Sequence, residues 1–201
     1  MPAIETSFAL LAVWAVLGYL AGSIPFGMVL AKIMGLGNLR DIGSGNIGAT
    51  NVLRTGNKTA AALTVLLDGA KGAVMVLLAR AITGEDAAQL AGLMAFLGHC
   101  YPVWLGFKGG KGVATFLGLM LALAWPVGIA CCATWLVGAA ATRMSSFAAI
   151  LSASFSTIWI VLLGYPALFF LGVALTVLVF WRHRENISRL RAGTEPKIGQ
   201  K

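Results

Sequence analysis

Two glycine-rich segments carry the residues best suited to bind a phosphate. The first runs from 43 to 51 with the sequence GSGNIGATN, and Arg54 follows it. Closely spaced glycines adopt backbone conformations that other residues avoid, so their N–H groups can converge on an anion. The spacing formally matches G-x-G-x-x-G, but no strand precedes it and no βαβ unit surrounds it. The segment therefore predicts an anion-binding loop, or else a flexible polar loop, rather than a dinucleotide fold.

The second glycine-rich segment runs from 107 to 115 with the sequence FKGGKGVAT. Its glycines let the backbone approach a ligand, and Lys108 and Lys111 supply positive charge. It does not match a P-loop, because Lys111 is followed by Gly112 instead of Ser or Thr. A short basic turn on the inner membrane face is the alternative interpretation. That alternative explains the lysines but leaves the glycines unexplained.

The basic tail that begins at Arg182 forms a third polar segment. On a helix His183 and Asn186 share one face with Ile187 and Leu190. Glu185 and Arg189 have the spacing of an ion pair. We expect His183 and Asn186 to face the membrane-proximal surface together. A solvated basic end that simply stops the last span is the alternative.

Charged and polar residues also occur inside apolar segments. Asp68 and Lys71 lie three residues apart, so they can pair on a helix, either to brace the fold or to serve a function. His99 is interpreted as a hydrogen-bonded packing residue. No Asp follows it at the required spacing, since the fifth residue after it is Trp104, so the His-x4-Asp signature of acyltransferases that use acyl-CoA or acyl carrier protein is absent. The residue spacing indicates no metal site, and the three cysteines are expected to be free thiols.

Composition shows which elements must position these segments. The 201 residues are 59% hydrophobic and 11% charged, whereas a soluble domain carries about 25% charged residues. Residues 6–31, 112–142 and 144–181 form long uncharged runs. Uncharged runs of more than about 18 residues are typical of membrane spans. The N-terminal segment lacks the positive start of a cleaved signal peptide, so we expect the first span to be retained.

The distribution of positive charge predicts the topology. The two longer runs divide naturally at Trp125-Pro126 and at Gly164-Tyr165-Pro166, which gives seven spans. If the N-terminus lies outside, residues 32–58, residues 107–112 and the basic tail lie inside, in accordance with the positive-inside rule. We therefore predict an all-α, polytopic membrane protein with seven transmembrane helices, a periplasmic N-terminus and a cytoplasmic C-terminus. A kink is expected near Ser23 and Pro25.

The same motifs resemble those of one known family. The segments at 22–27, 43–54, 107–115 and 182–186 are similar in order and spacing to the motifs of the PlsY family, the bacterial acyl-phosphate:glycerol-3-phosphate acyltransferases. The resemblance extends from about residue 10 to 195, with no departure at the motif positions. It implies a multi-pass enzyme of the bacterial cytoplasmic (inner) membrane with its site on the cytoplasmic face. It also implies that acyl phosphate, not acyl-CoA, donates the acyl group, and that lysophosphatidic acid is the product.

This resemblance guides the expected roles of the residues. The chain is treated as one transmembrane acyltransferase domain, 1–201, with a flexible tail at 193–201. We expect no cofactor, no metal and no nucleic-acid partner. The lipid bilayer and an enzyme that forms acyl phosphate and hands it over are the expected partners. The expected acyl-phosphate-binding residues are Ser44, Gly45, Asn46, Gly48, Thr50 and Asn51. The expected glycerol-3-phosphate-binding residues are Arg54, Lys108, Lys111, Ser146, His183 and Asn186. Ser44, Arg54, His183 and Asn186 are expected to be catalytic, and Asp68, Lys71 and Glu185 structural.

Three alternatives stay open at this point. Either His183 or a phosphate oxygen of a substrate could take the proton from the attacking hydroxyl, and we favour the substrate because no carboxylate is placed to orient His183. Either phosphate could occupy either cradle. A transporter of small phosphorylated anions is the main rival function, although its sites would be expected near the middle of the bilayer.

Overall fold

The protein is built from helices. The computed structural model describes residues 2–200, and no β-strand occurs within this range, which confirms the predicted all-α class. The α-helices are α1 (Phe8–Gly22), α2 (Phe26–Ile33), α3 (Ala49–Leu53), α4 (Lys58–Ile82), α5 (Glu85–Cys100), α6 (Val113–Leu123), α7 (Trp125–Thr142), α8 (Ser145–Leu162), α9 (Phe169–Arg182) and α10 (Arg184–Arg191). Short 3-10 helices occur at Leu39–Asp41, Val103–Leu105 and Pro166–Leu168.

The predicted breaks within the apolar runs are present. The first run is interrupted between α1 and α2, where Ser23 Oγ donates to the carbonyl oxygen of Tyr19 at 2.8 Å and Pro25 has no N–H to continue the helix. A second break separates α6 from α7 at Ala124, immediately before Trp125 and Pro126. The third break lies at Gly164, whose φ of +80° ends α8 in the left-handed region. Proline and glycine thus divide the chain where the sequence predicts.

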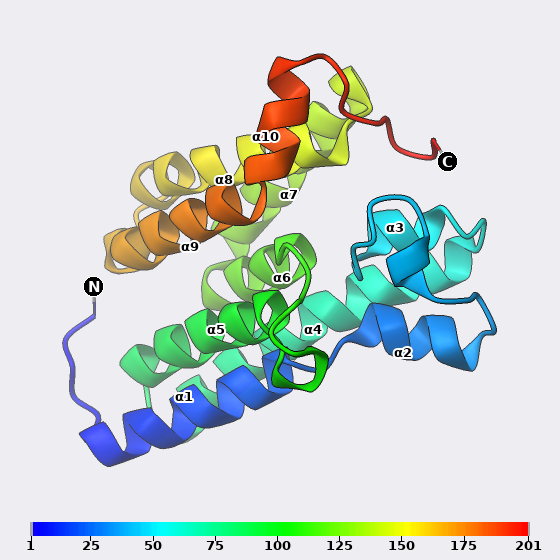
Figure 1. The fold of residues 1–201 in the computed structure, drawn as a ribbon. Coiled ribbons are helices and arrows are strands. Elements are labelled where there is room, and N and C mark those ends of the chain that lie inside the picture. The colour runs from blue at the N-terminus through cyan, green and yellow to red at the C-terminus, as the bar shows by residue number, and fades with distance from the viewer. Residues whose placement is uncertain (1, 201) are drawn as a thin grey trace.

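The helices form two groups that join through α6 and α7. In Figure 1, α1, α4, α5 and α6 lie together, and α7, α8 and α9 lie together beside them. The N-terminus lies at one end of the bundle, next to the start of α1. The C-terminal segment lies at the opposite end, close to α2 and α3. The glycine-rich segments and the basic tail therefore gather at the end of the molecule that is far from the N-terminus.

Small residues allow the helices of the first group to approach closely. Gly18 and Gly22 of α1 face the backbone of Ala91 and Ala95 of α5, and a side-chain carbon at either glycine would collide with that backbone. Such small-xxx-small contacts are typical of helices packed within a membrane. Because this packing fixes α5, it also fixes the start of the glycine-rich segment that follows it.

The helices differ in their capacity to cross a membrane. Four candidates are long and apolar enough, namely residues Phe8–Ile33 together with α4, α7 and α8, and a fifth is the bent pair formed by α9 and α10. α5 has 16 residues and α6 has 11, which is fewer than the roughly 20 needed for a full span. The number of seven spans and their orientation therefore stay predictions.

A buried ion pair braces the first group of helices. Lys71 Nζ lies 2.9 Å from Asp68 Oδ1, and both side chains are 3% exposed. Lys71 also donates to the carbonyl oxygen of Ile24 at 2.8 Å, which lies within the break between α1 and α2. His99 of α5 lies on the other side, with its Nδ1 3.6 Å from the same Asp68 oxygen. The pair thus connects α4 to the broken first run and to α5.

Candidate active site

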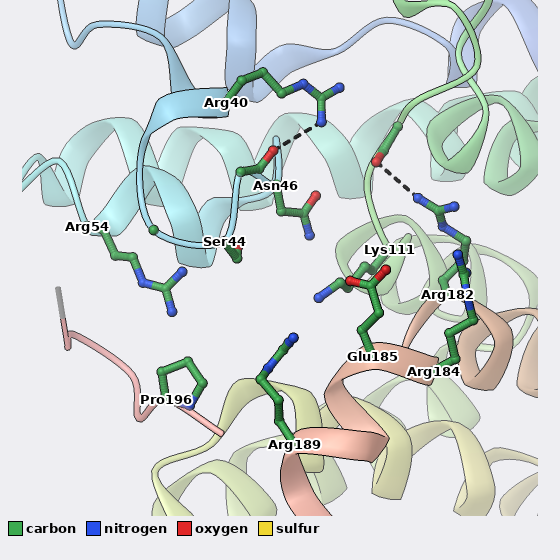
Figure 2. Close-up of a pocket in the computed structure, with 13 residues that line it drawn as sticks. Arg40, Ser44, Asn46, Arg54, Lys111, Arg182, Arg184, Glu185, Arg189 and Pro196 are labelled. Atoms are coloured by element: carbon green, nitrogen blue, oxygen red, sulfur yellow. Dashed lines mark hydrogen bonds between the residues drawn. The ribbon is translucent and has the colours of Figure 1, made fainter. Parts of the chain in front are cut away.

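A large polar cavity lies where the glycine-rich segments meet the C-terminal helix. Its volume is about 570 Å³, and Figure 2 shows its lining side chains converging from α10, the two loops and the tail. Basic side chains dominate the lining: Arg40, Arg54, Lys111, Arg182, Arg184 and Arg189. Glu185 is the acidic lining residue of this cavity. An excess of fixed positive charge in a concave site attracts anions.

The first glycine-rich segment forms a tight loop before α3. Gly43 and Gly45 have φ values of +51° and +66°, so both adopt left-handed conformations. Asn51 holds the loop closed, because its Nδ2 donates to the carbonyl oxygens of Leu39 and Asn46, both at 2.8 Å. Its Oδ1 accepts from the backbone N–H of Ser44 at 3.2 Å. Asn51 is 2% exposed, and both the nitrogen and the oxygen of its side-chain amide form hydrogen bonds within the loop.

Arg54 is placed over the same loop. Its Nη1 donates to Asn51 Oδ1 at 3.2 Å, and its Nε donates to the carbonyl oxygen of Gln200 at 3.1 Å. The Thr50 hydroxyl lies 3.1 Å from that of Ser145 at the start of α8. Side chains of this loop therefore reach both the tail and α8.

The first part of the second glycine-rich segment serves as a scaffold, because its N–H groups are bonded within the fold. The N–H groups of Lys108, Gly109 and Gly110 are already bonded to the carbonyl oxygens of Leu105, Cys100 and His99. What the segment presents to the cavity is Lys111, whose Nζ donates to Asn186 Oδ1 at 2.5 Å. Burial lowers the pKa of Lys111 to about 8, so the ammonium is still mainly charged at pH 7.

His183 marks the bend between α9 and α10, which meet at 64°. The bend places His183 and Asn186 together at the cavity, 2% and 5% exposed. His183 Nδ1 lies 2.8 Å from the carbonyl oxygen of Val179, and a carbonyl only accepts, so the neutral ring carries its proton on Nδ1. Burial, and secondarily the charge of Lys111, lower the pKa of His183 to about 4. The imidazole is therefore neutral at pH 7.

Glu195 is a site residue that the sequence analysis did not single out. Its carboxylate accepts from Ser146 Oγ and Asn186 Nδ2, both at 2.6 Å, and from Arg189 Nε at 2.8 Å. Burial alone would raise the pKa of Glu195, but these hydrogen bonds outweigh it and hold the pKa below its usual value. The predicted pairing of Glu185 with Arg189 is wrong, since Arg189 pairs with Glu195. The geometry of the bend and of the returning tail decides the partner, and helical spacing does not reveal it.

The chain after α10 folds back over the site. Its sequence suggests a flexible tail at 193–201, and in the structure Glu195, Pro196 and Ile198 line the cavity. Besides the bonds of Glu195, the N–H of Ile198 donates to the carbonyl oxygen of Arg143 at 2.6 Å. Pro196 lines the cavity directly, as Figure 2 shows.

A second limb of about 390 Å³ continues from the polar cavity between the helices. The two limbs share residues of both glycine-rich segments and of the tail: Ser44, Asn46, Arg54, Lys111, Arg189 and Pro196. Its walls also include apolar side chains from α4, α6 and α7: Val65, Val113, Leu117, Trp135 and Leu136. The combined space can hold a molecule with an anionic head and an apolar chain.

Most of the predicted site residues meet at these two limbs. Members that line one limb or both are Ser44, Gly45, Asn46, Gly48, Thr50, Asn51, Arg54, Lys111, Ser146, His183 and Asn186. Lys108 is the exception, because its side chain is exposed and lines neither limb. Arg40, Arg182 and Glu195 were missed. Their charges are visible in the sequence, but no motif spacing distinguishes them from ordinary membrane-flanking charges.

No metal centre is evident in the part of the chain that the structure describes. Across residues 2–200, no group of three or more His, Cys, Asp or Glu side chains could hold a metal ion. The expectation that the protein needs no metal stays a prediction. What the site offers directly is positive charge and neutral hydrogen-bond donors.

The fold and the site together define a helical membrane protein with a basic cavity that suits an anionic ligand. Residues 12–193 match the family model described as glycerol-3-phosphate acyltransferase. The chain belongs to the PlsY family of integral membrane glycerol-3-phosphate acyltransferases.

Relatives and solved structures agree on this family. The chain is 70% identical to the glycerol-3-phosphate acyltransferase of Ruegeria pomeroyi, covering 100% of this chain and 99% of the relative. It is 68% identical to the enzyme of the same name from Roseobacter denitrificans, covering 98% and 99%. The glycerol 3-phosphate form of crystalline PlsY is 40% identical with a TM-score of 0.89, covering 94% of this chain and 96% of the other. The lysophosphatidic acid form is 38% identical with a TM-score of 0.85, covering 93% of this chain and 94% of the other.

Proposed function

We propose that this acyltransferase uses acyl phosphate as its donor and acylates the sn-1 hydroxyl of glycerol 3-phosphate. The hydroxyl oxygen forms a bond to the acyl carbonyl carbon, and the bond from that carbon to the phosphate oxygen breaks. Lysophosphatidic acid and inorganic phosphate are the products. The observation that carries the proposal is that the arginine- and lysine-lined cavity shares six wall residues with an apolar limb between helices.

The two phosphates are assigned to neighbouring parts of the cavity. The donor phosphate lies against the 43–51 loop, with Ser44, Asn46 and Thr50 as its side-chain donors. The phosphate of glycerol 3-phosphate lies toward Lys111, Arg54, Ser146, His183 and Asn186. Lys108 is left out of this set because its side chain does not line the cavity. The fatty chain occupies the apolar limb, where it reaches the bilayer between the helices.

The proton of the attacking hydroxyl passes to a phosphate oxygen of a substrate. A base with a pKa near the working pH is the most effective, and phosphate monoesters have a second pKa of about 6. The pKa of His183 is about 4, which makes its imidazole the weaker base. Its unprotonated Nε2 can accept a hydrogen bond from a hydroxyl of glycerol 3-phosphate. Catalysis then comes from placing an already activated donor next to the hydroxyl in a positively charged site.

The proposal includes an orientation in the membrane. The termini lie at opposite ends of the bundle, which supports their placement on opposite sides of the membrane. The basic loops and tail favour a periplasmic N-terminus and a cytoplasmic C-terminus, with the seven spans proposed from the sequence. The cavity then opens to the cytoplasmic face of the inner membrane. There it can receive soluble glycerol 3-phosphate, as well as acyl phosphate handed over by the enzyme that forms it.

A comparison of donors tests this function. Purified protein is assayed for lysophosphatidic acid with palmitoyl phosphate or with palmitoyl-CoA, each with glycerol 3-phosphate and with a chelator present. We expect product only from palmitoyl phosphate, with one inorganic phosphate released for each acyl group transferred. Equal or faster reaction with palmitoyl-CoA, or phosphate release without glycerol 3-phosphate, would contradict the proposal.

A further inference from the structure

Arg40 joins the two glycine-rich segments, although it belongs to neither. It lies in the 3-10 helix Leu39–Asp41 and lines the polar cavity. Its Nη1 donates to the carbonyl oxygen of Gly45 at 3.1 Å, and its Nη2 donates to the carbonyl oxygen of Lys108. Figure 2 shows its guanidinium beside the first loop at the rim of the cavity. One side chain therefore holds the backbone of both segments.

Within residues 2–200, no second hydrogen bond connects the two segments directly. Among the hydrogen bonds formed by residues 2–200, the bond from Arg40 to Lys108 is the one that connects residues 38–54 with residues 107–112. Arg182 contacts the second segment from the opposite side, with Nε and Nη2 on the carbonyl oxygens of Gly110 and Gly109 at 3.0 and 3.1 Å. Arg182 thus holds the second segment to α9. The hydrogen bond from Arg40 is what connects that segment to the first loop.

The chemistry of the guanidinium suits a bridge of this kind. Its planar fork carries several donors in fixed directions, so it can bond two carbonyl groups at once. A lysine ammonium on a flexible stem would keep the positive charge but lacks that rigid geometry. Both Arg40 hydrogen bonds go to backbone oxygens of the two segments, so these donors are used within the protein. Arg40 is therefore suited to positioning the loops.

We propose that Arg40 is a positioning residue that sets the separation between the donor-phosphate loop and the loop that presents Lys111. This inference rests on the proposed function, in which each segment holds one substrate. Bonds within each segment keep its own shape, so each substrate can still bind when Arg40 is changed. What is lost is their relative placement, and a misplacement of about 1 Å can reduce a rate by about 100-fold.

The test compares Arg40→Lys and Arg40→Ala with wild type in steady-state assays with palmitoyl phosphate and glycerol 3-phosphate. For both variants we expect kcat to fall by about 10- to 100-fold with both KM values within about threefold of wild type. Arg191→Lys is the control, because it makes the same change of side chain at an exposed arginine of α10 that lines neither limb of the cavity. That control is expected to keep wild-type kinetics.

Three results would overturn the inference. These are full kcat in Arg40→Lys, a rise in one KM with unchanged kcat, and a lowered thermal unfolding midpoint that accounts for the lost activity of both Arg40 variants. The first would show that charge suffices, the second direct binding of a phosphate, and the third a general role in folding. Wild-type protein that fails to use palmitoyl phosphate would instead contradict the proposed function, so the two failures are distinguishable.

Discussion

Replacing Lys111 by methionine tests the assignment of the glycerol 3-phosphate site. Methionine keeps much of the side-chain volume and removes the ammonium that the second glycine-rich segment presents to the cavity. A hydrogen bond between charged groups is worth about 1.5–3 kcal/mol. At about 1.4 kcal/mol for each factor of ten, Lys111→Met should raise KM for glycerol 3-phosphate by about 10- to 150-fold.

The same substitution should leave the fold intact. Burial lowers the pKa of Lys111 to about 8, so folding disfavours the charged ammonium rather than drawing stability from it. The thermal unfolding midpoint of Lys111→Met should therefore stay within about 3 °C of wild type. The assay measures initial rates over a range of glycerol 3-phosphate at saturating palmitoyl phosphate. An unchanged KM, or a KM rise accompanied by a large loss of thermal stability, would refute the reasoning.

The buried ionisable side chains give three further predictions. Because the folded pKa of Lys111 is lowered to about 8, its charge is present below that pH and lost above it. The kcat/KM for glycerol 3-phosphate should therefore fall as pH rises through about 8. In the measured pH profile, Lys111→Arg should move that fall to higher pH. His183→Ala should chiefly raise KM for glycerol 3-phosphate, and a collapse of kcat at unchanged KM would show that the imidazole is the base. Asp68→Asn should destabilise the protein by about 3–5 kcal/mol, because it leaves the buried Lys71 without its counter-charge; in thermal unfolding, the double variant Asp68→Asn/Lys71→Met should be less destabilised than the sum of the single variants.

The sequence predicts the helical architecture well because its physical signals are local. Uncharged runs identify membrane segments without any knowledge of tertiary contacts. Proline and glycine divide them at Pro25, Pro126 and Gly164, and the structure breaks there. The lengths of individual helices are harder to predict. α6 has only 11 residues because Ala124 ends it in an extended conformation, and hydropathy does not register such an end.

The site is predicted in its residues but not in its geometry. The motifs identify Ser44, Lys111 and Asn186 because their residue types suit a phosphate, and the structure brings them to one cavity. The separate roles of the site residues depend on long-range hydrogen bonds, which leave no periodic pattern in the sequence. Asn51 closes its own loop, although it was expected to bind donor phosphate. Glu195 enters the site only because the tail turns back after α10.

Simultaneous binding of both substrates is the claim on which the account depends, and a calorimetric titration tests it most directly. Glycerol 3-phosphate is titrated into purified protein saturated with an acyl phosphonate, a donor analogue whose acyl group cannot be transferred. The account predicts that one glycerol 3-phosphate binds to each protein chain in the presence of the bound analogue. Loss of glycerol 3-phosphate binding in proportion to analogue occupancy would contradict it, because the two phosphates would then compete for a single place.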